Sequence, residues 1–197
     1  IVDRLVRTKV RGRLGGRLQF FISGGAALNP EIGNFFMALG INLLQGYGQT
    51  EASPLISANR PGKIKIETVG PVVAGVDLKI AADGEILVRG DLLMKGYWRD
   101  DAATSAVIQN GWLHTGDLGE VDADGFITIT GRKKDIIVNS GGDNIAPGRV
   151  EALLTIEPEI EQAMVDGDKR PWLAAIIVPS EEVRSLASSP DALATMV

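Results

Sequence analysis

The sequence has no cysteine and only one histidine, His114, in 197 residues. Without cysteine, these residues can form no disulfide framework, zinc finger, thiolate nucleophile or iron–sulfur cluster. A single histidine excludes sites that need two imidazoles, such as that of a HExxH zinc protease. Nucleophilic catalysis of the Ser-His-Asp type would depend on His114 alone, and we expect this histidine to be partly packed rather than catalytic.

Long apolar runs are also absent. The longest, Leu173 to Val178, is much shorter than the roughly 20 residues of a membrane span. The lack of cysteine fits the cytosol, so we expect a cytoplasmic protein with at most a peripheral contact to a membrane. The chain begins with Ile rather than Met, and we expect it to be a piece of a longer protein.

Positive charge is in deficit, with 20 Lys and Arg against 25 Asp and Glu and a net charge of -5. We therefore expect no nucleic-acid partner, since phosphate backbones attract basic surfaces. Residues 1–17 are nevertheless strongly basic. We interpret them as a solvated helix face; a transit peptide is the alternative, but no cleavage-type spacer follows.

Glycine is abundant, at 24 residues, while 45% of the chain is hydrophobic and 23% is charged. This composition is typical of a globular protein long enough to bury a core, and not of a low-complexity chain. We therefore expect the glycines in turns and binding loops.

The first part of the chain has the pattern strand, helix, strand. Gln19 to Ser23 is an apolar run closed by a glycine pair, Pro30 to Ala38 has a helical pattern, and Ile41 to Leu44 is a second apolar run. This order favours a parallel strand pair in an α/β sheet.

From about Thr68 the pattern changes to short alternating strands, with hairpin turns at Asp83-Gly84 and Asp124-Gly125. We expect an antiparallel barrel or sandwich of about 60 residues here. The predicted fold class is α/β plus β, in three parts: residues 1–66 as an α/β piece, 67–131 as a β-barrel subdomain, and 132–197 as an α+β piece.

The last of these parts combines strands with helices. We expect a strand from Asp135 to Val138, a helix opened by Pro147, a hairpin around Asp166-Gly167 and a helix from Ser180.

Four segments carry residues suited to ligand chemistry, and the first is Ser23-Gly24-Gly25-Ala26. A glycine pair between a strand and a helix lets backbone N–H groups face a phosphate or a flat base. A plain turn explains this segment equally well, and it lacks the lysine of a Walker loop.

The second segment, Gly46-Tyr47-Gly48-Gln49-Thr50-Glu51, follows a predicted strand and is expected at the carboxyl end of the sheet, where α/β folds bind ligands. Tyr47 can stack on an aromatic base. Thr50 offers a hydroxyl to a phosphate, and Glu51 offers the hard anionic oxygen that suits Mg²⁺. The alternative is a surface loop whose tyrosine packs on the core and whose acid is solvated.

The third and fourth segments follow further along the chain. Gly111 to Asp117 places an acid in a tight glycine turn ahead of a strand from Leu118; this acid could bind a ribose diol, or form an ordinary Asp turn. Gly131 to Asn144 begins with cations where two patterns meet, which suggests a charged hinge with Arg132 able to bind a diol or phosphate. A solvated basic turn is the alternative.

Together these segments resemble the acyl-adenylate-forming superfamily, which includes acyl-CoA synthetases, firefly luciferase and the adenylation domains of peptide synthetases. SGGAAL, QGYGQTEASP, LMKGYW, NGWLHTGDLG and DGFITITGRKKDIIVNSGGDNIAP occur in the family's order over roughly residues 18 to 180. LMKGYW and GRKKDIIVNSGG are most similar to bacterial long-chain fatty acid CoA ligases.

The resemblance implies the end of a large N-terminal domain, with its sheet piece and barrel, followed by the start of a small mobile C-terminal domain. It also implies an ATP-dependent ligase with fatty acid, ATP, Mg²⁺ and CoA as partners. A carboxylate would attack the α-phosphate of ATP to give acyl-AMP and pyrophosphate, and the thiol of CoA would then displace AMP. Mg²⁺ and hydrogen-bond donors, rather than a protein nucleophile, would stabilise the charge at phosphorus.

Residue roles follow from the same resemblance. Thr50 would touch the α-phosphate and Glu51 would hold Mg²⁺, so these two are the catalytic candidates. Lys134 would be the hinge about which the C-terminal domain rotates, and the loop Ser140-Gly141-Gly142 would approach CoA. The implied nucleotide-binding residues are Gly24, Gly25, Ala26, Gly46, Tyr47, Gly48, Thr50, Asp117 and Arg132. Among them, the tyrosine would stack on adenine, and the aspartate and arginine would bind the ribose hydroxyls.

The sequence also departs from the family pattern. It contains neither the Ser/Thr/Gly-rich phosphate loop with its lysine nor the C-terminal catalytic lysine, which we expect beyond Val197, and Val138 stands where many relatives carry lysine. We expect this chain alone to keep weak nucleotide affinity without catalysing adenylation. Fatty-acid-dependent pyrophosphate release by the chain alone would contradict this expectation.

Three other interpretations stay open at this point. The parent could be a ligase for aryl or short- and medium-chain acids, or a non-catalytic nucleotide- or acyl-binding module. A β-rich interaction domain is the third, and it would require GYGQTE and TGD to lie far apart in space.

Overall fold

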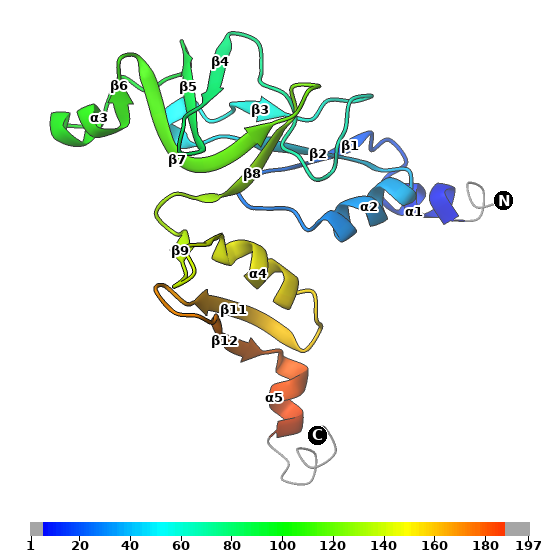
Figure 1. Ribbon diagram of the computed structural model, residues 1–197. Helices are drawn as coiled ribbons and strands as arrows, with labels where there is room; N and C mark the ends of the chain where they lie inside the picture. The colour runs from blue at the N-terminus through cyan, green and yellow to red at the C-terminus, as the bar shows by residue number, and fades with distance from the viewer. Residues whose placement is uncertain (1–5, 188–197) are drawn as a thin grey trace. The chain divides into compact units, whose positions relative to one another are not determined.

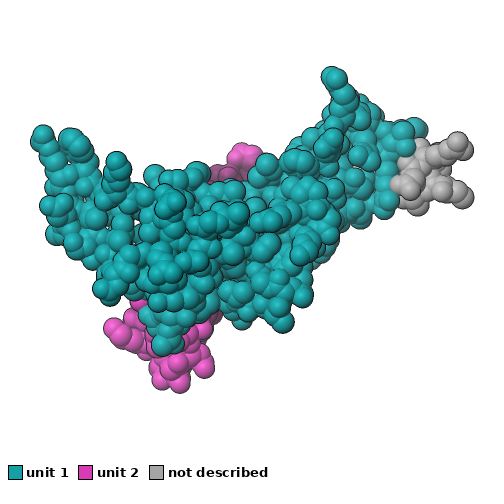
Figure 2. All heavy atoms as spheres, turned by 90° about the horizontal axis from the view of Figure 1, so that it is seen from above, with its two compact units in different colours: residues 1–129 teal, residues 130–197 magenta. Residues whose placement is uncertain are grey.

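The computed structural model describes residues 6–187, and the chain divides into two compact units, residues 1–129 and 130–197 (Figure 2). The first unit contains two β-sheets, and the second contains hairpins and helices. Within the described residues, no helix is both long enough and apolar enough to cross a membrane.

Unit 1 begins with a short helix and a parallel strand pair. β1 pairs with β2 in parallel, and β3 joins the other edge of β2 antiparallel (Figure 1). The predicted parallel pair is therefore confirmed. The elements are α1 (Thr8–Arg13), β1 (Phe20–Ser23), α2 (Pro30–Ala38), β2 (Asn42–Tyr47) and β3 (Ser57–Ala58).

Local chemistry explains the ends of these elements. Asn29 accepts the amide of Glu31 at 2.8 Å and caps α2, whose first residue is a proline. β2 is longer than the predicted run because β3 pairs with Gly46 and Tyr47. These two residues consequently lie in the strand and not in a loop after it. The basic helix α1 buries no side chain, as expected for a solvated face, while residues 1–5 lie outside the described residues.

The second sheet of unit 1 is five-stranded and antiparallel, as predicted for this region. Its strand order is β4-β5-β7-β6, and β8 also pairs with β7, the long curved strand of Figure 1. Gly84 and Gly125 occupy the two predicted hairpin turns, with φ of +85° and +83° that glycine adopts without strain. The strands are β4 (Val76–Ile80), β5 (Glu85–Gly90), β6 (Ile108–Gln109), β7 (Trp112–Val121) and β8 (Ile127–Arg132).

The core of unit 1 joins this sheet to the segment that follows β2. Side chains of β5, β7 and β8 pack against apolar residues from the chain between Glu51 and Gly70. This packing fixes the short 3₁₀ helix Thr50–Ala52 against the antiparallel sheet. The buried members are Ala52, Ile56, Val69, Ile86, Val88, Leu113 and Ile127.

The predicted turn at Asp117 ahead of a strand from Leu118 is wrong, because Asp117 lies inside β7. Leu87 faces His114 and Glu85 faces Leu118, so two steps along β5 correspond to four along β7. β7 therefore carries a bulge of two extra residues. Thr-Gly-Asp has the composition of a turn, but β5 pairs with β7 on both sides of it, so the segment is a bent part of the strand with Gly116 at φ +72°.

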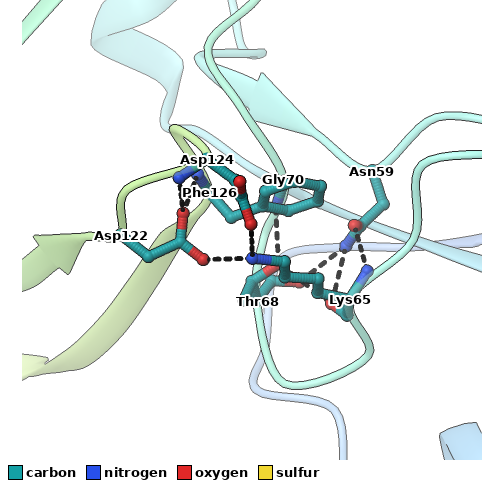
Figure 3. A network of polar contacts seen from close by, with 7 residues as sticks. All are labelled: Asn59, Lys65, Thr68, Gly70, Asp122, Asp124 and Phe126. Carbon is teal, nitrogen blue, oxygen red and sulfur yellow. Dashed lines mark hydrogen bonds and ion pairs between the residues drawn. The ribbon is translucent and has the colours of Figure 1, made fainter.

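A polar network ties the chain before Gly70 to the turn between β7 and β8 (Figure 3). The ammonium of Lys65 lies 2.5 Å from Asp122 and 2.7 Å from Asp124, and 4.5 Å from the ring centroid of Phe126. The amide of Lys65 also donates to the side-chain oxygen of Asn59 at 3.0 Å. One side chain thus joins two segments that are more than 50 residues apart in sequence.

Unit 2 combines hairpins with helices, and its predicted helix at Pro147 and hairpin around Asp166-Gly167 are confirmed. The predicted strand from Asp135 is too long, since the amide of Asp135 donates to the Arg132 carbonyl in a turn. Its elements are β9 (Ile137–Val138), β10 (Asn144–Ile145), α4 (Pro147–Leu154), β11 (Ile160–Asp166), β12 (Ala174–Pro179) and α5 (Glu181–Ala187).

One helix of unit 1 was not predicted. α3 (Asp101–Val107) begins after Asp100, whose carboxylate accepts the amide of Ala103 at 2.8 Å. This cap is a local signal that sequence inspection could have found.

Candidate functional site

Two of the predicted nucleoside-binding residues meet in unit 1. Tyr47 ends β2 and Asp117 lies in the β7 bulge, and the tyrosine hydroxyl donates to Oδ2 of the aspartate at 2.7 Å. Asp117 is 4% exposed, and Tyr47 packs against the core cluster. The interaction-domain interpretation, which requires the GYGQTE and TGD segments to lie far apart, is therefore wrong.

The pair suits a nucleoside chemically. A carboxylate can accept about four hydrogen bonds, so Asp117 can hold the tyrosine hydroxyl and also bind hydroxyl groups of a ligand. The tyrosine ring provides an aromatic surface beside it. An aromatic face next to a diol acceptor matches the two halves of a nucleoside.

The glycines of the first two motifs also come together, because β1 and β2 are neighbours. A Cβ on Gly24 would lie 3.3 Å from the carbonyl oxygen of Gly46. A Cβ on Gly48 would lie 1.6 Å from the Pro54 carbonyl oxygen, so the backbone of Pro54 excludes any side chain there. Gly25 has φ +82°, in the left-handed region that glycine favours. Gly24, Gly25 and Ala26 are exposed.

Glu51 has a partner that sequence reasoning missed. The hydroxyl of Tyr97 donates to Oε1 of Glu51 at 2.9 Å, and the amide of Met94 donates to the Glu51 carbonyl at 2.8 Å. Both partners belong to the LMKGYW motif, which therefore lies against the Thr50–Ala52 helix. The sequence shows the LMKGYW motif in the family's order. The spacing between motifs does not show that this motif contacts Glu51.

The Tyr97–Glu51 bond changes the acidity of the phenol. The hydrogen bond from Tyr97 to Glu51 raises the pKa of the phenol, and burial adds to the same direction. A raised pKa keeps the hydroxyl protonated, so it stays a donor to Glu51 at neutral and moderately alkaline pH.

The carboxylate of Glu51 is suited to hold a magnesium ion that arrives with a nucleotide. Among residues 6–187, no group of three or more His, Cys, Asp or Glu gathers into a metal cluster. Mg²⁺ is commonly held by one or two carboxylates together with substrate phosphates and water. Glu51 is a hard oxygen ligand of that kind, next to the hydroxyl-bearing Thr50.

His114 is partly packed, as expected. Its side chain is 30% exposed, and Nδ1 lies 3.2 Å from Oε2 of the buried Glu85. The other oxygen of Glu85, Oε1, accepts the amide of Gly116 at 2.9 Å. Sequence reasoning did not single out Glu85.

The remaining predicted residues belong to unit 2. Arg132 ends β8, and Lys134 lies in the turn that follows it. The loop after β9 is held by Asn139, whose Oδ1 accepts the amides of Gly141 and Asp143 at 2.9 Å each. The amide of Ser140 donates to the Arg170 carbonyl at 3.0 Å, so this loop is anchored to the β11–β12 connection.

The chain is similar in sequence to known proteins. Residues 1–98 match the model of the AMP-binding enzyme family, and residues 134–197 match that of the AMP-binding enzyme C-terminal domain. The long-chain fatty-acid–CoA ligase FadD15 of Mycobacterium bovis is 47% identical over 182 residues, which are 92% of this chain and 30% of that protein. The chain thus spans about a third of the length of such relatives.

The fold is also similar to that of solved structures. O-succinylbenzoate coenzyme A synthetase (MenE) from Bacillus subtilis in complex with AMP has a TM-score of 0.74 at 31% identity, over 89% of this chain and 40% of that one. The same enzyme with ATP and magnesium ion also gives 0.74, at 30% identity, over 90% and 42%. The two family models, the identities and the shared fold together establish that the chain belongs to the AMP-binding enzyme family.

Proposed function

We propose that the whole protein containing this chain is an ATP-dependent long-chain fatty acid–CoA ligase. The observation that supports this most directly is the bond between Tyr47 and Asp117, which brings two family motifs together in space. The 47% identity to a mycobacterial enzyme named as a long-chain fatty-acid–CoA ligase supports the acyl class. Ligases for aryl or short-chain acids are less favoured, since the MenE match is 31% identical.

In the proposed mechanism, the nucleoside is held before chemistry begins. The ring of Tyr47 stacks on the adenine, and Asp117 accepts hydrogen bonds from the ribose hydroxyls. The exposed glycines Gly24 and Gly25, next to Ala26, let a base approach the backbone closely. Gly46 and Gly48 allow the close packing of the chain that follows β2. This positioning holds the α-phosphate in place for in-line attack.

The first half-reaction needs charge stabilisation. The fatty acid carboxylate attacks the α-phosphorus, the bond to the β-phosphate oxygen breaks, and pyrophosphate leaves with both bonding electrons. The hydroxyl of Thr50 contacts an α-phosphate oxygen, and Glu51, oriented by Tyr97, is the residue that would hold Mg²⁺. When bound, that ion neutralises charge on the phosphate oxygens.

The second half-reaction uses the other unit. The thiol of CoA attacks the acyl carbonyl and AMP leaves. We assign Lys134 as the hinge between the half-reactions, and the loop Ser140-Gly141-Gly142 as the part that approaches CoA.

AMP release by the whole protein over a graded series of carboxylic acids, with and without CoA, tests the proposal. We expect CoA-dependent turnover that peaks at long acyl chains. A peak at aryl or short acids would move the protein to another ligase class. No turnover with any acid would favour a non-catalytic nucleotide- or acyl-binding module.

A further inference from the structure

A buried acid beside the site has no part in the mechanism above. Glu85, the first residue of β5, is 4% exposed. Burying a carboxylate is costly unless it is paired and hydrogen-bonded. Its Oε1 accepts the Gly116 amide at 2.9 Å, and its Oε2 lies 3.2 Å from Nδ1 of His114. Both oxygens therefore face the stretch of β7 that carries Asp117.

The amide bound by Glu85 belongs to the bulge. In a regular antiparallel ladder, β5 carbonyls would accept the amides of β7, but the extra residues of a bulge lose such partners. A partly buried amide that is shielded from water and has no acceptor costs free energy. Oε1 of Glu85 supplies this acceptor at 2.9 Å. Gly116 has φ +72°, which favours glycine at the bend.

Other bonds fix the residues on both sides of Gly116. The Thr115 hydroxyl donates to the Ile86 carbonyl at 2.8 Å, and the Asp117 amide donates to that hydroxyl oxygen at 3.1 Å. The Asp117 carboxylate then accepts the Tyr47 hydroxyl. A continuous series of contacts consequently runs from Glu85 through the bulge to the nucleoside site.

We propose that Glu85 is a positioning residue for nucleotide recognition, whose carboxylate holds the β7 bulge in the form that presents Asp117 to the ribose. The inference rests on the proposed function, because it requires Asp117 to bind the ribose. It makes a specific claim: loss of the Glu85 acceptor weakens recognition of the ribose hydroxyls, and not nucleotide binding in general.

The test measures the affinity of the whole protein for AMP, 2′-deoxy-AMP and 3′-deoxy-AMP by calorimetry. The three nucleotides differ only in their ribose hydroxyls, and the measurement needs no metal ion. In the unsubstituted protein we expect AMP to bind about tenfold more tightly than at least one deoxy analogue, the size of one hydrogen bond to a charged acceptor.

Two conservative variants separate the geometry of Glu85 from its charge. Glu85→Gln keeps the length and an acceptor oxygen for Gly116, and is expected to keep the preference for AMP within about threefold. Glu85→Asp keeps the charge but withdraws it by one methylene, and is expected to lose about tenfold in AMP affinity with little change for the deoxy analogue. Glu85→Ala is expected to behave like Glu85→Asp. Melting temperatures identify any variant that fails to fold. If Glu85→Ala fails to fold, the affinities of Glu85→Gln and Glu85→Asp decide the test.

The outcomes are distinguishable. An unchanged AMP preference in Glu85→Asp, or a parallel loss of affinity for AMP and its deoxy analogues, would overturn the inference and leave the proposed function standing. Absence of AMP binding, or of any preference for AMP, in the unsubstituted protein would instead overturn the proposed function.

Discussion

At the scale of single residues, two tyrosines hold the two acids of the candidate site. Tyr47 donates to Asp117 at 2.7 Å and Tyr97 donates to Glu51 at 2.9 Å. Hydrogen bonds to a charged acceptor are short and strong, and they orient a carboxylate before a ligand arrives. In the function proposed above, the two acids serve different parts of one nucleotide: Asp117 would bind the ribose and Glu51 the phosphate-bound metal.

Removing the Asp117 carboxylate in the whole protein should weaken ATP binding. Asp117→Ala deletes a charged acceptor, so we expect a loss of about 1.5–3 kcal/mol, or roughly 10- to 150-fold in the dissociation constant measured by calorimetry. The exposed acid Asp91 offers a matched control, since Asp91→Ala removes the same charge from the surface. Unchanged ATP affinity in Asp117→Ala would refute the ribose role.

Tyr97→Phe removes only the hydroxyl that orients Glu51. We expect the Mg²⁺ concentration for half-maximal ATP binding to rise about threefold to tenfold, with AMP affinity unchanged. Because the pKa of Tyr97 is raised, the phenol is protonated at neutral pH and the effect should be constant from about pH 6 to pH 9. Equal losses for ATP and AMP would contradict a role specific to the metal ligand.

The site was only partly predictable from the sequence. Tyr47 and Asp117 stand in motifs whose order and type indicate a nucleotide site. Tyr97 and Glu85 act through contacts with partners 46 and 31 residues away, which no local pattern encodes. A tyrosine at the start of a turn and an acid at the start of an apolar strand have many ordinary explanations. Their partners are therefore visible only in the folded chain.

At the scale of elements, predictability follows the range of the interactions. The hairpins at Asp83-Gly84 and Asp124-Gly125 depend on a few adjacent residues, and both were predicted correctly. β7 depends on pairing with β5, so its continuation through Thr115 to Asp117 was missed. Short-range chemistry thus predicts turns and caps, while sheet register decides where a strand ends.

The ion pairs of Lys65 with Asp122 and Asp124 contribute to the stability of the fold, and this contribution depends on pH. The hydrogen bond from Lys65 lowers the pKa of Asp122, and the bonds to Asp122 and Asp124 raise the pKa of Lys65. The lowered carboxyl pKa contributes stability above the ordinary value of about 4, which is lost as pH falls through the folded value. The raised ammonium pKa contributes stability below about 10.5, which is lost as pH rises through the folded value.

Lys65→Met tests this contribution, because it keeps an apolar stem beside Phe126 without the charge. We expect the difference in melting temperature between the two proteins to be small, steady from about pH 5 to pH 10, and to vanish near pH 2. High salt should reduce it. A difference that grows at acid pH would show that the ion pairs do not stabilise the fold.

At the scale of the whole molecule, the chain divides between Ile129 and Thr130, within β8. Lys134 lies in the turn just after that strand. A hinge requires backbone rotation, and proline fixes φ.

In the whole protein, Lys134→Pro is therefore expected to spare acyl-AMP formation and to slow thioester formation about tenfold or more. Lys134→Ala, which leaves φ free, should spare both. Pyrophosphate exchange follows the first half-reaction and acyl-CoA formation the second. Equal loss of both in the proline variant would argue against a hinge.

The bulge in β7 has a consequence for how recognition and folding are combined. Side chains of a strand alternate between its faces, and an insertion of two residues preserves that alternation. Leu113, Thr115, Asp117 and Gly119 are accordingly all buried. Deletion of Gly116 and Asp117 should therefore keep this alternation while abolishing AMP binding. Because the deletion leaves the buried Glu85 without the Gly116 amide, we also expect the melting temperature to fall. Because the number of inserted residues is even, a strand can gain a residue that contacts a ligand without turning any core side chain outward. Such a residue can be added or lost while the pairing of the sheet on both sides is kept.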